Sequence, residues 1–182
     1  MEIKKKEIHA ENLDYIIRSA QEEDAKSLSE IRLKIDGETE NLDREKGEAF
    51  LSVFDFQEII KDDTKNLGNL FLVAVVNDKI VGFSRCVGSS LKRFSHKAEF
   101  GICILKDYWG FGIGKNLLKE TVLWADSGKI EKISMNVLEK NVKAIELYKK
   151  FGFEVEGLLK KDKKLSDGEY CNTVIMGRVR ED

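Results

Sequence analysis

The segment 98–114 constrains the fold most, because an alternating apolar pattern there leads directly into a run of glycines. The alternating residues are Phe100, Ile102 and Ile104. Their period of two predicts a β-strand, since the side chains of a strand point to opposite faces in turn. The glycines that follow are Gly110, Gly112 and Gly114. From Ile113 to Ala125 apolar residues recur at helical spacing, so the segment predicts a strand, a glycine turn and a helix in succession.

A strand, a glycine-rich turn and a helix in this order are typical of a phosphate site. The first turn of a helix has four N–H groups without intrahelical partners and carries the positive end of the helix dipole. Glycines let a phosphate approach this backbone without an intervening Cβ. A tight turn that needs glycines only for its own geometry is the alternative. Three glycines at alternate positions favour a phosphate or pyrophosphate ligand.

Two common phosphate-binding motifs do not match this segment. A Walker A loop requires Ser or Thr after its Gly-Lys pair, whereas Gly114 and Lys115 are followed by Asn116. A dinucleotide-binding fingerprint would need its third glycine at position 115, which is lysine. Particular residues therefore exclude both motifs.

Two motifs of this chain resemble those of the GNAT superfamily of N-acetyltransferases. The family's cofactor motif, Gln/Arg-x-x-Gly-x-Gly/Ala, aligns from Trp109 to Gly114, with Trp109 at the position that is usually Gln or Arg. A second family motif, Asn-x-x-Ala-x-x-Leu-Tyr-x-x-x-Gly-Phe, matches at every fixed position from Asn141 to Phe153. The resemblance covers about residues 15–179, is strongest from Glu99 to Phe153 and is weak before Leu70.

The resemblance implies an α/β fold with a GNAT-like mixed, mostly antiparallel sheet of six to seven strands, flanked by helices on both faces. It implies acetyl-CoA as co-substrate and no metal. The acetyl group would pass directly to a primary amine of a small molecule or peptide N-terminus in a ternary complex. The alternative is a catalytically silent module that binds or senses acyl-CoA. The expected cofactor-binding residues are Cys103, Ile104, Leu105, Trp109, Gly110, Phe111, Gly112, Ile113, Gly114, Lys115, Asn141 and Tyr148.

Two residues are candidate catalysts. In the family the tyrosine of the second motif points at the cofactor sulfur, so Tyr148 is the expected acid, although helical spacing alone would make it a core aromatic. Glu99 is the expected base, often acting through water, and a carboxylate that merely faces solvent is the equal alternative. Cys103 is interpreted as a packed strand cysteine and not as a nucleophile, because no histidine lies in a partner motif. Asn141 fits a helix N-cap as well as a cofactor contact.

Periodicity and turn residues divide the rest of the chain into strands and helices. The strands are expected at 15–20, 70–76, 79–88, 98–104, 132–137, 153–160 and 170–179. The helices are expected at 22–35, 50–61, 113–128 and 141–151. Length and the absence of a linker predict a single N-acetyltransferase domain over residues 1–182, with residues 1–14 as a loosely ordered start.

Composition narrows the partners and the compartment. Apolar residues make up 42% and charged residues 35%, and the net charge is −2. No overall field therefore attracts the chain to nucleic acid or to an anionic membrane. Three cysteines without metal-ligand spacing, and no apolar run long enough to cross a bilayer, fit a cytoplasmic protein. A homodimer is compatible with the sequence.

The region 36–58 is the one clue to the amine acceptor, because acidic residues far outnumber basic ones there. The acids are Asp36, Glu38, Glu40, Asp43, Glu45, Glu48, Asp55 and Glu58, against Arg44 and Lys46. The resemblance places this loop beside the acceptor, where its charge would concentrate a cationic amine. A loop that is simply solvated is the alternative.

Overall fold

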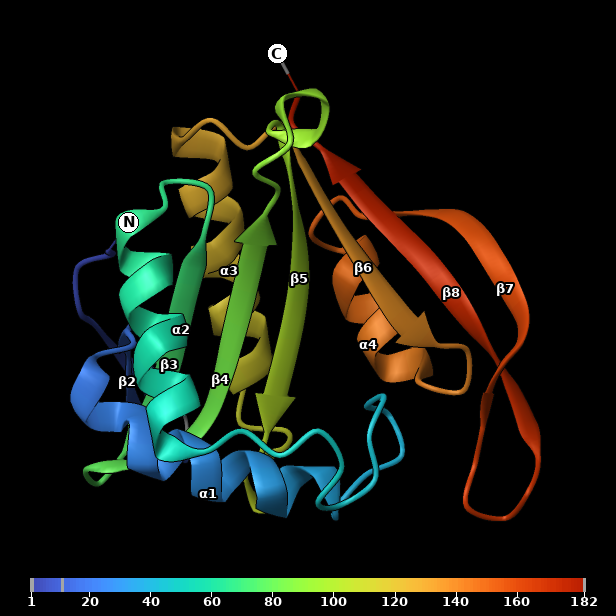
Figure 1. The fold of residues 1–182 in the computed structure, drawn as a ribbon, viewed down its shortest axis with the longest axis horizontal. Coiled ribbons are helices and arrows are strands. Elements are labelled where there is room, and N and C mark those ends of the chain that lie inside the picture. The colour runs from blue at the N-terminus through green and yellow to red at the C-terminus, as the bar shows by residue number, and fades with distance from the viewer. Residues whose placement is uncertain (1, 11, 182) are drawn as a thin grey trace.

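The computed structural model describes residues 2–10 and 12–181 (Figure 1). Its strands are β1 (Lys6–Ala10), β2 (Leu13–Ser19), β3 (Leu70–Val76), β4 (Lys79–Gly88), β5 (Lys97–Ile104), β6 (Lys132–Leu138), β7 (Glu154–Lys164) and β8 (Tyr170–Val179). Its helices are α1 (Ala25–Asp36), α2 (Val53–Lys65), α3 (Ile113–Ser127) and α4 (Val142–Lys149). Short 3-10 turns cover Glu22–Asp24, Lys92–Phe94 and Lys106–Tyr108.

The strands form one mixed sheet in the order β1-β2-β3-β4-β5-β6-β8-β7. Every pair of neighbours is antiparallel except β5 and β6, which run parallel. The predicted α/β fold with a mostly antiparallel sheet is therefore confirmed. The sheet has eight strands, one more than the upper end of the prediction.

The additional strand is β1, which lies in the segment expected to be a loosely ordered start. Residues 6–10 pair with residues 13–17 of β2 in an antiparallel hairpin. For these residues the prediction is wrong, because the neighbouring lysines obscure the alternation of Ile8 and Ala10, which both pack against the core. Met1 and Glu11 lie outside the described residues.

The helices cover both faces of the sheet. On one face Phe56 of α2 packs against Phe83 of β4, with ring centroids 6.5 Å apart. Phe83 is the cross-strand partner of Cys103, so the side chain of Cys103 shares this face. On the opposite face Gly114 of α3 lies directly against Ile104, the neighbour of Cys103 in β5. Helices α1 and α2 therefore pack on one face, and α3 packs on the other (Figure 1).

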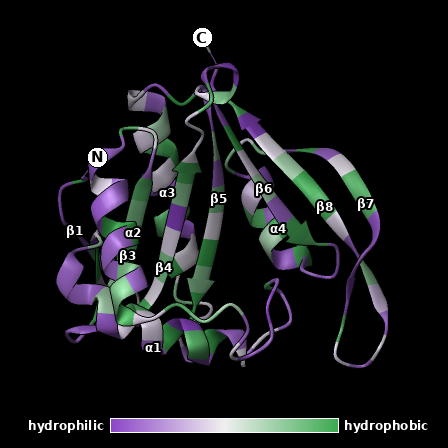
Figure 2. Ribbon diagram, viewed as in Figure 1, coloured by the Kyte–Doolittle hydropathy of each residue, from purple (hydrophilic) through white to green (hydrophobic). Residues whose placement is uncertain are grey.

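The core lies at the centre of this sheet. All seven residues of β3 are buried, as its continuous apolar run predicts for a strand covered on both faces. Figure 2 shows the hydrophobic colouring along the central strands and the hydrophilic colouring on the outward faces of the helices. None of the helices in the described ranges is long and apolar enough to cross a membrane.

The sheet separates at one place, between β5 and β6. These strands pair only where residues 97–99 meet residues 132–134, whereas β6 pairs with β8 along its whole length. Beyond Glu99 the two strands diverge (Figure 1). The N–H of Leu105 donates to the carbonyl of Val81 at 3.0 Å. Because antiparallel pairing alternates, the backbone groups of residues 100, 102 and 104 face the opening and not β4.

Gly82 permits the close contact of β4 and β5 beside this opening. A Cβ at this position would lie 3.0 Å from the carbonyl oxygen of Cys103 and 3.0 Å from Cγ1 of Ile104. We expect Gly82→Val to destabilise the protein by about 1–3 kcal/mol, because an overpacked side chain must push the strands apart. The measurement is urea unfolding followed by circular dichroism.

Gly101→Ala is the matched control on β5, since its added Cβ would meet no atom within 4 Å. The control should leave the free energy of unfolding unchanged or raise it by about 0.5 kcal/mol, because alanine restricts the unfolded chain. Equal stability losses in the two variants would contradict the close approach at Gly82.

Candidate active site

A cavity of about 730 Å³ occupies the opening between β5 and β6. It is lined from both faces of the sheet and by the loop that follows α1. Its residues with reactive or charged side chains are Arg32, Asp43, Arg44, Arg85, Glu99, Cys103, Lys143 and Tyr148. A cavity of this size is typical of a small-molecule site.

Most of the residues predicted from the sequence come together around this cavity. Those that line it are Glu99, Cys103, Ile104, Trp109, Gly110, Gly114, Asn141 and Tyr148. Phe111, Gly112 and Lys115 are outside the lining, and the side chains of Leu105 and Ile113 are buried in the core. Ile113 can therefore contact a ligand only through its backbone.

The three glycines serve two different purposes. Gly110 and Gly112 have φ angles of +89° and +78°, in the left-handed region that residues with a Cβ rarely adopt. Gly112 is the N-cap of α3, so the first N–H groups of the helix are directed outward beyond it. Gly114 is helical, and a Cβ there would lie 3.2 Å from Cδ1 of Ile104. Two glycines thus shape the turn, and the third lets α3 pack closely on β5.

Trp109 replaces the Gln or Arg of the family motif and makes a contact of its own. Its indole Nε1–H donates to the carbonyl oxygen of Ile104 at 2.9 Å. This carbonyl belongs to the edge of β5 that faces the opening. The indole remains 45% exposed and lines the cavity. Trp109 therefore joins the end of β5 to the glycine turn.

Tyr148 projects from α4 into the cavity lining and is 7% exposed. Its ring meets Phe100 edge-on, with centroids 6.5 Å apart, and lies 6.1 Å from the ring of Phe153. Burial, assisted by the negative charge that Cys103 would carry, raises the pKa of Tyr148 to about 12. The phenol therefore keeps its proton at neutral pH. At the start of the same helix, the side chain of Asn141 accepts a hydrogen bond from the N–H of Ala144 at 3.3 Å, which makes it the N-cap.

Glu99 and Cys103 lie on the same face of β5 but differ in environment. Glu99 is exposed, lines the cavity and is the last residue of β5 paired with β6. Cys103 is 9% exposed, and burial is the main cause that raises its pKa to about 12. The thiol is therefore protonated at neutral pH and is a poor nucleophile. This agrees with the interpretation of Cys103 as a packed residue.

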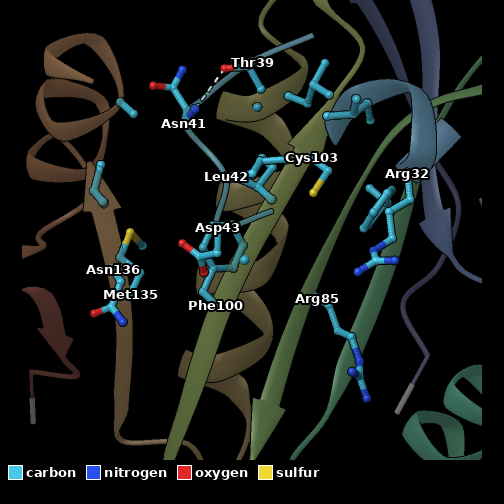
Figure 3. A pocket seen from close by; sticks show the side chains of 18 of the residues that line it. Arg32, Thr39, Asn41, Leu42, Asp43, Arg85, Phe100, Cys103, Met135 and Asn136 are labelled. Atoms are coloured by element: carbon cyan, nitrogen blue, oxygen red, sulfur yellow. Dashed lines mark hydrogen bonds between the residues drawn. The ribbon is translucent and has the colours of Figure 1, made fainter. Parts of the chain in front are cut away.

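The cavity is also lined by three arginines that were not predicted from the sequence as site residues: Arg32, Arg44 and Arg85. Figure 3 shows Arg32 and Arg85 on the side of the cavity opposite Met135. The sequence does carry a signal for Arg32, because this cation lies at helical spacing among the apolar residues of the buried face of α1. No local motif marks the other two, since their positions depend on how distant elements pack.

Several carboxylates of the acidic region are engaged in contacts within the protein. Glu40 accepts a hydrogen bond from the N–H of Ser166 at 2.8 Å, and Asp43 forms an ion pair with Lys163. Asp36, the last residue of α1, is almost fully buried and forms an ion pair with Arg44 of the loop that follows. The loop is therefore attached to the β7–β8 hairpin. Steering of a cationic acceptor by the charge of this region stays a prediction.

The chain belongs to the acetyltransferase (GNAT) family, whose model matches residues 36–153. It is 36% identical over 110 residues to the L-amino acid N-acetyltransferase AaaT of Escherichia coli, a match over 60% of this chain and 67% of that protein. It is 40% identical over 53 residues to the spermine/spermidine N(1)-acetyltransferase of Bacillus subtilis, a match over 29% of this chain and 35% of that protein. The predicted family is thus confirmed, and the chain is an N-acetyltransferase.

Solved structures share the fold over nearly the whole chain. A GNAT-family acetyltransferase from Streptococcus pneumoniae has a TM-score of 0.88 at 26% identity, covering 92% of this chain and 99% of that one. The yncA protein of Salmonella typhimurium, solved with its cofactor acetyl-CoA, has a TM-score of 0.81 at 18% identity, covering 92% and 95%. The opening between β5 and β6 thus belongs to a fold that binds acetyl-CoA in yncA.

Proposed function

We propose that this chain transfers the acetyl group of acetyl-CoA directly to a primary amine of a small molecule, with both substrates bound together. The observation that supports this most is that one cavity reaches both faces of the sheet through the opening between β5 and β6. Tyr148 lines it from the α4 side, and Glu99 lines it from the strand beside the α1–α2 face. An acid and a base therefore have access to the same space from different sides.

The residues present fit acetyl-CoA as the donor. The edge of β5 that faces the opening offers backbone N–H and C=O groups to an amide-containing arm, as an added strand would require. The N-terminus of α3 behind Gly112 offers N–H groups and a positive dipole end to a pyrophosphate. Bound there, acetyl-CoA supplies an activated acyl group whose departing sulfur needs a proton.

The protons of the transfer are accounted for as follows in this proposal. Glu99 accepts a proton from the acceptor ammonium group, through water, and leaves a neutral nitrogen. That nitrogen forms a C–N bond with the thioester carbon, the C–S bond breaks, and the nitrogen releases its second proton to solvent. Tyr148 donates its phenolic proton to the departing thiolate and is reprotonated from solvent. Because its pKa is raised, the phenol stays protonated until negative charge develops on the departing sulfur.

Direct transfer is favoured over a covalent acyl-enzyme. Cys103 is the cysteine of the cavity lining, and its thiol stays protonated at neutral pH because its pKa is raised to about 12. Neither histidine of the chain lines the cavity, so none is placed to activate that thiol. The names of the two relatives support a small-molecule amine, since one refers to L-amino acids and the other to spermine and spermidine.

The glycine turn gives the first test of this proposal. Gly112→Val should weaken acetyl-CoA binding at least about tenfold, or 1.4 kcal/mol, because a β-branched residue cannot easily adopt the left-handed conformation that begins α3. Isothermal titration calorimetry measures the affinity. Gly168→Val is the control, because Gly168 has a φ angle of +87° but lies in the β7–β8 turn and not at the start of α3. Equal affinities in the two variants would refute the role of the turn.

Tyr148→Phe tests the proposed acid. We expect kcat to fall about 10²-fold, the usual contribution of a positioned acid, with little change in the affinity for acetyl-CoA. In the wild type, kcat should not lose activity through Tyr148 until the pH approaches its pKa of about 12. Stopped-flow release of CoA thiol measures both. A normal kcat in the variant would show that Tyr148 packs in the core and is not the acid.

Glu99→Gln tests the proposed base. The acidic limb of the pH profile of kcat/KM should disappear, because glutamine has no carboxylate to titrate. At high pH the amine is already neutral, so the rates of the variant should approach those of the wild type. If the variant keeps the acidic limb, another group or the amine itself sets it.

A further inference from the structure

Arg32 is a buried cation whose hydrogen bond goes to a backbone carbonyl and not to a carboxylate. It is 9% exposed, lies on α1 and lines the cavity. Its Nη1–H donates to the carbonyl oxygen of Ala49 at 2.7 Å. Within the described ranges no carboxylate lies at ion-pair distance from it. Figure 3 shows its side chain beside the cavity, between Cys103 and Arg85.

The other two arginines of the cavity differ from Arg32 in this respect. Arg44 makes two hydrogen bonds to Asp36, at 3.1 and 3.3 Å. Arg85 makes two hydrogen bonds to Asp63, at 2.5 and 2.9 Å. Their charges are therefore compensated by buried carboxylates. Burial first, and then the positive charge of Arg44, lower the pKa of Arg32, and the charge of Asp36 offsets only part of this. Burial and the charge of Arg44 are free-energy costs that a bound anion would relieve.

The donors of Arg32 suit a carboxylate ligand. A guanidinium carries five N–H donors in a planar fork, and the hydrogen bond to Ala49 uses one nitrogen. The fork matches the two oxygens of a carboxylate. Cys103, the nearest thiol on this face, supplies no anion, because its pKa is raised to about 12. The remaining donors of Arg32 can therefore bind an anionic ligand.

We propose that the amine acceptor is an amino acid whose carboxylate binds Arg32. This inference rests on the proposed function, because it assigns the α1–α2 side of the same cavity to the acceptor. The carboxylate would lie at Arg32 and the amine toward Glu99. An apolar side chain would contact the aromatic group that lines the cavity, Phe56, Phe71 and Phe83. Their ring centroids lie 5.9–6.5 Å apart, so they form a continuous apolar surface.

Matched acceptors test the carboxylate directly. L-Phenylalanine, L-phenylalaninamide and 2-phenylethylamine share an amine and a phenyl ring, but only the first carries a carboxylate. With the wild type, kcat/KM for L-phenylalanine should exceed that for the other two by at least about tenfold. Spermidine, which has amines but no anion, should be a poor acceptor. If the amide, the amine or spermidine equals the acid, the proposal is overturned.

Variants then assign the preference to Arg32. Arg32→Met should raise KM for L-phenylalanine at least about tenfold, or 1.4 kcal/mol, and leave KM for acetyl-CoA unchanged. Lys143→Met is the control, because Lys143 is an exposed cation in the lining from the α4 side and should not affect the preference for the acid. Equal losses with the acid and with 2-phenylethylamine in Arg32→Met would overturn the assignment.

A binding measurement separates this proposal from the proposed function. 3-Phenylpropanoate has the carboxylate and the ring but no amine, so it can bind without reacting. It should raise the melting temperature of the wild type, and 3-phenylpropanamide should not. If no amine releases CoA but 3-phenylpropanoate binds, the proposed function fails and the anion site stands. If Arg32→Met does not fold, the comparison of these two compounds on the wild type decides, and equal effects overturn the site.

Discussion

The loss of pairing between β5 and β6 beyond Glu99 is the feature on which the rest of this structure depends. Two parallel strands that stayed paired would close the sheet and leave no passage between its faces. Their divergence exposes backbone hydrogen-bonding groups on β5 that no neighbouring strand satisfies. The indole of Trp109 pairs with the carbonyl of Ile104, and a ligand with amide bonds can pair with others. The gap thus lets Tyr148 and Glu99 line one cavity.

The sequence predicted the elements where local pattern and tertiary packing agree. The continuous apolar run of 70–76 is fully buried, and the helix that begins after Gly112 is present as expected. The start of the chain was mispredicted, because the short strand β1 has only two apolar residues between charged ones. Its stability comes from pairing with β2, which no local window reveals.

Site residues that belong to a local sequence motif could be predicted. Those whose positions depend on the packing of distant elements could not. Trp109 and Tyr148 lie in motifs, and both line the cavity. Arg85 gave no signal, because its place depends on Asp63 of a helix more than twenty residues away along the chain. Arg32 gave a signal of another kind, because it is a charged residue on the apolar face of a helix. A buried charge at such a position needs a partner in the protein or in a ligand. The contacts of Glu40 and Asp43 likewise could not be foreseen from charge alone.

The attachment of the α1–α2 loop to the β7–β8 hairpin has a consequence for how the protein is made. The hydrogen bond from Ser166 to Glu40 joins residues 126 positions apart, among the longest separations in the fold. Such contacts form only after a large loop of chain has closed, and ribosomal synthesis delivers the N-terminal partner first. A nascent chain could thus assemble β1 to β4 and their helices before the loop after α1 has its partners. The last thirty residues then anchor that loop through the contacts of Ser166 with Glu40 and of Lys163 with Asp43.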